Sequence, residues 1–283
     1  MSDVNCTLCF HGCRLSEGVT GLCGARENRG GRVVSNNYGR LTSLALDPIE
    51  KKPLQRFYPK SRVLSVGSYG CNLSCPFCQN YEISRQSKEA YLALPERAKL
   101  EMSPEALVKL AVRLRAEGNI GIAFTYNEPT VGFEYVRDTA ELAREKDLKT
   151  VLVSNGSLCE QAWRELCLLI DAMNIDLKVF SEAGYRSLGG DFESVKRNIS
   201  AAVSLGCHVE LTTLVVPGLS DREEDMEAEA EYLSSISPEI PLHISRFFPR
   251  YRMSGRRPTD VSLVYRLAEI ARRHLHYVYT GNC

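Results

Sequence analysis

The sequence predicts an α/β fold built around a parallel sheet. From Arg62 to the C-terminus, six short apolar runs typical of strands alternate with amphipathic stretches typical of helices. Crossovers of this kind join parallel strands of one sheet, which is either doubly wound or curled into a partial barrel. In both arrangements a functional site lies at the carboxyl ends of the strands.

The predicted elements are short and regularly spaced. The strands are RVLSVG (62–67), IGIAF (120–124), TVLVS (150–154), AMNIDL (172–177), HVELTTLVV (208–216) and PLHISRF (241–247). Ser103 can cap the first helix, with Pro104 at its first position and apolar residues recurring on one face through Leu114. The other predicted helices span 133–146, 160–170, 193–205, 221–235 and 260–274.

The composition argues against several classes of protein. The 283 residues are 44% hydrophobic and 25% charged, as in ordinary globular proteins, and 35 basic residues balance 35 acidic ones. This balance removes the overall charge that attracts nucleic acids or anionic membranes. The chain has no run of about 20 apolar residues and does not start with a signal peptide, so we expect a cytoplasmic protein with no membrane or nucleic-acid partner.

Eleven cysteines are present, and seven of them form two tight groups. Disulfides are not expected in the cytosol, so the grouping indicates metal binding or catalysis. We therefore expect a small Cys-rich metal-binding subdomain with a connecting arm at residues 1–60, and an α/β core at residues 61–283. The terminal Cys283 is expected to be inert.

The first group provides four soft metal ligands in a C-x2-C-x3-C-x9-C arrangement: Cys6, Cys9, Cys13 and Cys23. Such a set can hold a structural zinc or a second iron-sulfur cluster, and free thiols are the alternative.

The second group is the loop GCNLSCPFCQN, which directly follows the first predicted strand of the core. Its three thiolates, from Cys71, Cys75 and Cys78, can hold three irons of a 4Fe-4S cluster and leave the fourth iron open to another ligand. A zinc site that takes its fourth ligand from elsewhere is the alternative.

Later strands also end in polar residues. Asp176 and Lys178 are two residues apart, so they point to the same side of the sheet, either as a functional pair or as a simple ion pair. In HISRFFPRYRMSGRR, we expect His243 and Ser245 to point inward, with His243 as a catalytic candidate. The arginines and aromatic residues of this segment could bind phosphate and a base, or a peptide carboxylate.

The Cys71–Cys78 loop, placed after a strand and before an αβ series, resembles the radical S-adenosylmethionine (SAM) superfamily. The resemblance implies a partial (β/α)6 TIM-like barrel in which the open iron chelates the amino and carboxylate groups of SAM. One electron from the cluster then cleaves the sulfonium to give a 5'-deoxyadenosyl radical, which abstracts hydrogen from a substrate. An electron carrier without SAM turnover and a zinc-dependent nucleic-acid-binding module remain as alternatives.

The resemblance also implies roles for single residues. Phe77 matches the aromatic residue that contacts adenine. In TYNEPT, Tyr-Asn-Glu replaces the superfamily's Gly-Gly-Glu, so Glu128 matches the carboxylate that binds the amino group of SAM, with Asn127 beside it. The remaining matches are to motifs of glycyl-radical activases, at Ser154 and Asn155 near the ribose, and at Asp176 and Lys178 near the methionine moiety and the substrate.

Five segments together are similar to the radical enzyme of the AmmeMemoRadiSam system, a relative of pyruvate formate-lyase activating enzyme: DPIEKKPL (47–54), GCNLSCPFCQN, TYNEPT, NIDLK and HISRFFPRY (243–251). This resemblance implies Memo-type or AMMECR1-type partners and a one-electron reductant such as flavodoxin or ferredoxin. The substrate would be a protein, a peptide or a small molecule, with glycyl-radical activation as the specific case.

Overall fold

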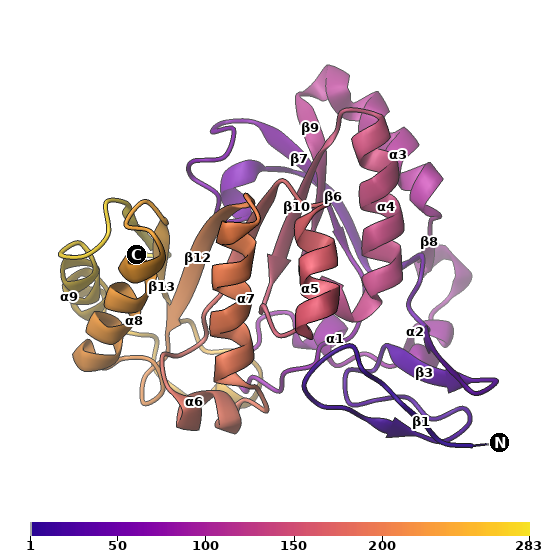
Figure 1. Cartoon of the computed structure of the whole chain (residues 1–283), viewed down its shortest axis with the longest axis horizontal. Helices are drawn as coiled ribbons and strands as arrows, with labels where there is room; N and C mark the ends of the chain where they lie inside the picture. Colours follow the sequence, from indigo (N-terminus) through magenta and orange to yellow (C-terminus); the bar gives the residue numbers. More distant parts are fainter. Residues whose placement is uncertain (1) are drawn as a thin grey trace.

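The computed structural model describes residues 2–283, and its centre is an eight-stranded sheet (Figure 1). The strand order is β14-β13-β12-β11-β10-β9-β7-β6, and only the β6–β7 pair is antiparallel. The strands are β6 (Ser43–Pro48), β7 (Arg62–Gly67), β9 (Asn119–Phe124), β10 (Lys149–Ser154), β11 (Ala172–Asp176), β12 (His208–Val215), β13 (Leu242–Arg246) and β14 (Val278–Gly281). All six predicted strands are confirmed, while β6 and β14 were not predicted.

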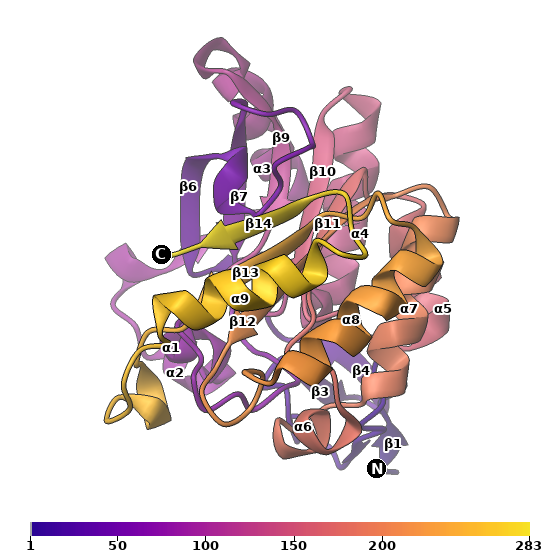
Figure 2. The same ribbon diagram turned by 90° about the vertical axis from the view of Figure 1, so that its left-hand side faces the viewer.

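Helices cover the outer face of the sheet, and Figure 2 shows α7, α8 and α9 packed side by side there. The long helices are α3 (Pro104–Arg113), α4 (Phe133–Glu145), α5 (Glu160–Cys167), α7 (Phe192–Ser204), α8 (Glu223–Ile236) and α9 (Val261–Ala271). Ser103 caps α3 as predicted, because its Oγ accepts a hydrogen bond from the amide of Ala106 at 3.3 Å. The apolar faces of these helices bury Leu107, Trp163 and Leu267 against the sheet.

Shorter elements complete the part of the chain that the structure describes. They are α1 (Tyr81–Ser84), α2 (Lys88–Leu92), α6 (Glu182–Ser187), and the 3-10 helices η1 (Ile49–Lys51), η2 (Glu96–Ala98), η3 (Leu114–Glu117), η4 (Pro129–Gly132) and η5 (Tyr251–Met253). None of the helices within residues 2–283 has the length and apolar character needed to cross a bilayer.

The N-terminal segment forms small antiparallel pairs beneath the carboxyl ends of the strands (Figure 1). The pairs are β1 (Val4–Asn5) with β2 (Arg14–Leu15), β3 (Arg26–Arg29) with β4 (Arg32–Ser35), and β5 (Arg40–Leu41) with β8 (Leu100–Glu101). Two ion pairs fasten this segment to the core: Arg26 with Glu134 on α4, and Lys88 with Glu27 at 2.7 Å.

Residues 49–57, which we call the arm, fill the interior of the curved sheet. Ile49, Leu54 and Phe57 are buried there, packed in one cluster with four small or branched strand residues, Val63, Ala123, Val151 and Ala172. Asn174 on β11 also donates a hydrogen bond to the carbonyl of Pro53 at 2.8 Å. The arm therefore contacts several strands at once from the concave side.

A fully buried carboxylate, Glu210 on β12, anchors the arm. It accepts hydrogen bonds from the amides of Gln55 at 3.0 Å and Arg56 at 2.8 Å. The ring nitrogens of His208 and His243 lie 2.9 and 2.6 Å from its two oxygens. Burial alone would raise the pKa of Glu210, but these hydrogen bonds outweigh it and lower the pKa to about 2.

The sheet is curled into a partial barrel, as predicted. Asn80, which follows β7, and Asn282, which follows β14, line the same cavity. In a flat sheet these strands would lie six spacings apart, or about 29 Å at about 4.8 Å per strand. Curvature therefore brings the ends of distant strands together around one space.

We predict that Glu210→Gln lowers the free energy of unfolding by about 1–3 kcal/mol, because the carboxamide nitrogen would face a backbone N–H that needs an acceptor. The pKa of Glu210 is lowered from 4.5 on folding, so its contribution is complete above about pH 4.5 and is lost as the pH falls towards 2. Urea denaturation should show that the difference in free energy of unfolding between parent and variant becomes smaller as the pH falls over that range.

The matched control is Glu227→Gln, which alters a more exposed carboxylate paired with His274 at 2.5 Å. It should change the stability little. Equal destabilisation by both variants would contradict an anchoring role for Glu210.

Candidate active site

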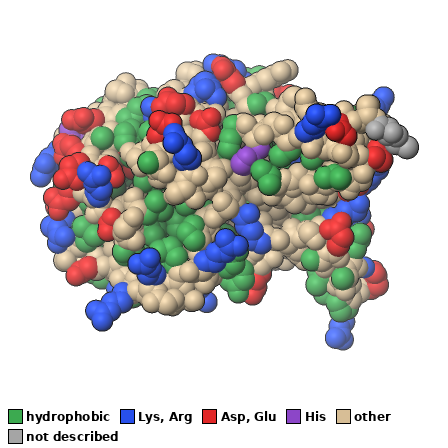
Figure 3. Space-filling view, turned by 90° about the horizontal axis from the view of Figure 1, so that it is seen from below, with side chains coloured by type: hydrophobic (Ala, Val, Ile, Leu, Met, Phe, Trp, Pro, Cys, Tyr) green, Lys and Arg blue, Asp and Glu red, His purple; other side chains and the backbone are tan. Residues whose placement is uncertain are grey.

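A cavity of about 320 Å³, open to solvent, lies at the carboxyl ends of the strands. Figure 3 shows the molecule from this side, with Lys and Arg side chains beside a hydrophobic area. The cavity wall includes most of the predicted site residues: Cys71, Cys75, Phe77, Cys78, Asn127, Glu128, Asn155, Asp176 and Lys178. The structure thus brings together residues that are more than 100 positions apart in the sequence.

The three cysteines of the loop after β7 all line this cavity. Among the described residues, the only group of three metal-ligand atoms within 4.8 Å of one another contains no cysteine. Zinc held by thiolates at about 2.3 Å would bring the sulfurs to about 3.8 Å from each other. The three sulfurs are not drawn together around one point, and each could bind a different iron of a cluster.

The environment of these thiols disfavours the thiolate form unless a positive charge is nearby. Burial raises the pKa of Cys71 and of Cys75, and the nearby Glu128 carboxylate raises that of Cys71 further. A bound metal supplies the positive charge that replaces the proton on each thiol.

Glu128 is buried, and its carboxylate connects the ends of β9 and β10. Oε1 accepts hydrogen bonds from the amide and hydroxyl of Thr130 and from the Ser154 hydroxyl at 2.8 Å, while Oε2 accepts one from the amide of Asn155 at 2.7 Å. Burial raises the pKa of Glu128, and the hydrogen bonds act in the opposite direction. Oε2 therefore has one protein donor where Oε1 has three.

Two asparagines hold the loops around the cavity in place. Asn127 accepts from the amide of Ser68 at 3.0 Å and donates to the carbonyl of Gly70 at 3.0 Å, which joins the ends of β7 and β9. Asn155 donates to the side chain of Asn72 at 2.9 Å, which joins the ends of β7 and β10. Both side chains therefore help to position the cysteine loop.

Asp176 and Lys178 form an ion pair of 2.9 Å on the cavity wall. Burial alone would lower the pKa of Lys178, but Asp176 and the sulfur of Cys75 outweigh it and raise the pKa. Lys178 therefore carries a fixed positive charge beside the cysteine loop.

Tyr126 matches the first glycine of the superfamily's Gly-Gly-Glu motif. The backbone conformation at this position is one that favours glycine. Its φ of 75° lies in the left-handed region, which is strained for an aromatic residue. The hydroxyl donates to Asp47 at 2.6 Å, and the buried ammonium of Lys52 lies 4.6 Å from the ring centre. Gly67 leaves room for the ring, because a Cβ there would lie 2.9 Å from it.

His243 does not line this cavity. It points inward, as does Ser245, but its ring is bonded to Glu210 beneath the site, whereas Ser245 is part of the cavity wall. His243 can therefore affect the site only indirectly, through Glu210 and the arm, and we give it no role in the proposed chemistry.

The cavity opens into an outer depression that shares Gln79, Asn80 and Asn282 with it and adds Phe248 and Arg250. Arg250 is the only arginine of the HISRFFPRYRMSGRR segment on this wall, while Arg246 is bonded to the carbonyl of Thr259 at 2.8 Å. We call this depression the mouth.

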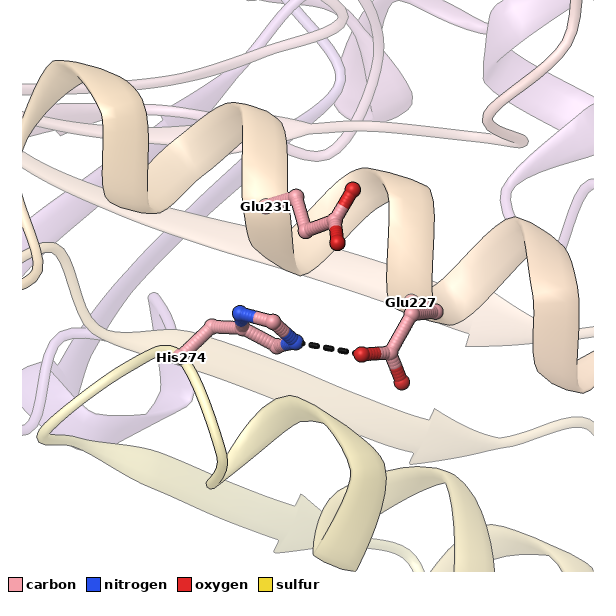
Figure 4. Close-up of side chains that lie close together, drawn as sticks. All are labelled: Glu227, Glu231 and His274. Atoms are coloured by element: carbon pink, nitrogen blue, oxygen red, sulfur yellow. Dashed lines mark hydrogen bonds and ion pairs between the residues drawn. The ribbon is translucent and has the colours of Figure 1, made fainter.

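The first cysteine group lines a second and much smaller cavity, together with His11, Arg26 and Asn72. A third cluster, Glu227, Glu231 and His274, joins α8 to the residues after α9 (Figure 4). Its His274–Glu227 contact lies near the surface, and nothing else within residues 2–283 indicates a ligand there.

Several wall residues were not predicted: Pro53 on the arm, Gln79, Asn80, Tyr126, Thr212 and Asn282. Among these residues, only Tyr126 could have been singled out from the sequence, because it replaces a glycine of the superfamily motif. The other residues come to the site through the curvature of the sheet, which no local pattern reports.

Comparison with known proteins agrees with this geometry. The radical SAM superfamily model matches residues 65–230. An uncharacterised protein of Methanocaldococcus jannaschii is 37% identical over 283 residues, covering 99% of this chain and 82% of the relative. A putative glycyl-radical enzyme activating enzyme of the same organism is 29% identical over 178 residues, covering 60% of this chain and 68% of the relative.

Among solved structures, Streptococcus suis SuiB bound to S-adenosylmethionine shares the fold, with a TM-score of 0.57 and 15% identity over 76% of this chain and 48% of SuiB. Because the superfamily model matches more than half of its length, the chain belongs to the radical SAM superfamily. Membership implies an enzyme with a 4Fe-4S cluster and SAM, and it confirms the sequence-based assignment at the level of the superfamily.

We predict that Tyr126→Phe lowers the free energy of unfolding by about 1–3 kcal/mol, because it removes the hydrogen bond to the buried Asp47 carboxylate while keeping the strained backbone. Thermal unfolding would measure the loss. Tyr38→Phe is the matched control, since its hydroxyl donates to Asp138 at 2.8 Å on the surface. If the two variants lose equal stability, the hydrogen bond between Tyr126 and Asp47 stabilises the fold no more than one at the surface does.

Proposed function

We propose that the protein binds a 4Fe-4S cluster through Cys71, Cys75 and Cys78, reductively cleaves SAM, and abstracts hydrogen from a substrate with the resulting 5'-deoxyadenosyl radical. The observation that carries the proposal is the single cavity that joins the three cysteines to the polar ends of β9, β10 and β11. When bound, the cluster supplies the electron and SAM supplies the sulfonium whose cleavage yields methionine and the radical.

The side chains around the cavity suit the parts of SAM. Oε2 of Glu128, with one protein donor, has the capacity to accept from the amino group. The ring of Phe77 and the side chain of Asn155 line the same wall and suit adenine and ribose.

Lys178 is the cation available to a carboxylate in this wall, and Asp176 orients it through the 2.9 Å ion pair. Because the pKa of Lys178 is raised, the ammonium persists at neutral pH and can hold the methionine carboxylate or a substrate anion.

The protein also limits the access of water to the reacting groups. Pro53 of the arm lies on the inner wall, and Leu73, Val153 and Leu214 add apolar surface. Substrate would enter through the mouth, beside Phe248 and Arg250. Exclusion of water matters because a carbon radical must meet only the intended hydrogen donor.

The relative named as a putative glycyl-radical enzyme activating enzyme favours a protein or peptide as the substrate, with a small molecule as the alternative. The proposal includes a flavodoxin or ferredoxin as reductant. It also includes Memo-type or AMMECR1-type partners, on the resemblance of the DPIEKKPL and HISRFFPRY segments. A simple electron carrier would have no use for a large cavity with an ordered carboxylate and an ammonium in its wall.

To test this function, the protein is reconstituted anaerobically with iron and sulfide, reduced with dithionite and given SAM. Chromatography should detect 5'-deoxyadenosine from the parent and from Cys283→Ala, an exposed cysteine outside both groups. Cys75→Ala should form at least about a hundredfold less, because one thiolate of the cluster is lost. No product from fully loaded parent, with candidate protein partners present, would favour the electron carrier.

A second test concerns SAM binding alone. Lys178→Met should weaken SAM binding at least about tenfold, since a charge-assisted hydrogen bond is removed. Equilibrium dialysis with labelled SAM measures this without turnover. Lys149→Met is the control, because Lys149 is also ion-paired, with Asp171 at 3.1 Å, but begins β10 at the opposite end of the sheet. Unchanged affinity in Lys178→Met would remove this residue from the site.

A further inference from the structure

The four cysteines of the N-terminal segment face one another across their own cavity. Cys6 and Cys23 are buried, Cys9 and Cys13 are partly buried, and all four line one small cavity. The amide of Cys6 donates to the carbonyl of Cys13 at 2.8 Å, so the loop that carries three of the cysteines is closed. All four potential ligands are therefore gathered around one cavity.

The four sulfurs are not drawn together around a single point. No three of these sulfurs lie within 4.8 Å of one another, as judged over the residues the structure describes. The radical SAM loop provides an internal comparison, because its three cysteines have the same property and the superfamily places a 4Fe-4S cluster on them. A tetrahedral zinc site would hold its sulfurs at about 3.8 Å.

The surroundings of the four sulfurs supply positive charge and N–H donors. The amides of Ala25 and Arg26 lie near the sulfur of Cys23, and the amide of His11 lies near that of Cys9. Arg26 is 6% exposed and lines the cavity, and its Nε has no hydrogen-bond partner within residues 2–283. An inorganic sulfide would give this buried donor an acceptor, which a lone zinc ion would not.

This second site is joined directly to the first. The amide of Cys71 donates to the carbonyl of Cys23 at 3.0 Å, so one hydrogen bond links a ligand of one set to a ligand of the other. The contact requires glycine at position 70, where φ is 96° and a Cβ would lie 2.5 Å from the Cys23 carbonyl. His11 adds a second link, with its Nε2 2.7 Å from the carbonyl of Asn72.

We infer that Cys6, Cys9, Cys13 and Cys23 hold a second 4Fe-4S cluster, and that this cluster passes electrons to the cluster on Cys71, Cys75 and Cys78. A low-potential donor of the flavodoxin or ferredoxin class loses one electron, the N-terminal cluster gains it and then loses it to the radical SAM cluster, and no atom is transferred. The relay, though not the presence of the cluster, rests on the function proposed above.

Iron, acid-labile sulfide and zinc are measured on the anaerobically reconstituted full chain. We expect about eight irons per chain, and about four both in the Cys6→Ala/Cys9→Ala variant and in the Cys71→Ala/Cys75→Ala/Cys78→Ala variant. The latter leaves the N-terminal ligands untouched, so its iron reports on them even if the former fails to fold. Cys283→Ala should keep about eight. One zinc with about four irons in the parent would overturn the inference.

Two further readouts test the relay. Reduced parent should give an electron paramagnetic resonance signal broadened by coupling between neighbouring clusters, and each cluster-deficient variant should give a simpler one. Formation of 5'-deoxyadenosine by Cys6→Ala/Cys9→Ala should fall at least about tenfold with reduced flavodoxin and much less with dithionite. Equal losses with both reductants would contradict the relay.

The two proposals can fail separately. Eight irons with coupled signals but no 5'-deoxyadenosine would retain the second cluster and reject SAM cleavage. Formation of 5'-deoxyadenosine by a parent chain that binds only four irons would retain SAM cleavage and reject the second cluster.

Discussion

The buried charge of Glu210 is the constraint on which the cavity depends. A carboxylate with no exposure inside a barrel must be surrounded by donors, and two of its four are backbone amides of the arm. The arm in turn fills the concave side with Ile49, Leu54 and Phe57 and leaves Pro53 as part of the cavity wall. The depth of the cavity is thus set by a segment that precedes the barrel in the chain.

The six central strands could be predicted because buried parallel strands are continuous apolar runs of β-branched residues. Two edge strands could not. SLALDP (β6) lies in a stretch without a clear pattern and is fixed by its antiparallel register with β7, while VYTG (β14) has only four residues. Both depend on a neighbouring strand that is already in place.

The same division applies to the site. Cys71 and Lys178 could be named as candidates from the sequence. A group of cysteines indicates metal binding, and two charged residues two positions apart at a strand end indicate a site. Pro53 and Asn282 could not be named in this way, because they reach the wall through tertiary contacts. For His243, strand alternation predicts that the side chain points inward. It does not predict the hydrogen bond to Glu210, which lies 33 residues away in the sequence.

The close contact between Cys23 and Cys71 has a consequence for how this protein can be divided. A chain begun at residue 61 would lose β6, the arm and the carbonyl that meets the Cys71 amide. The apolar interior would then open to water at one end, and the cysteine loop would lose a neighbour at the other. The N-terminal segment is therefore no detachable module, and insertions or fusions are better accommodated on the helical outer layer than at the junction between the two cysteine groups.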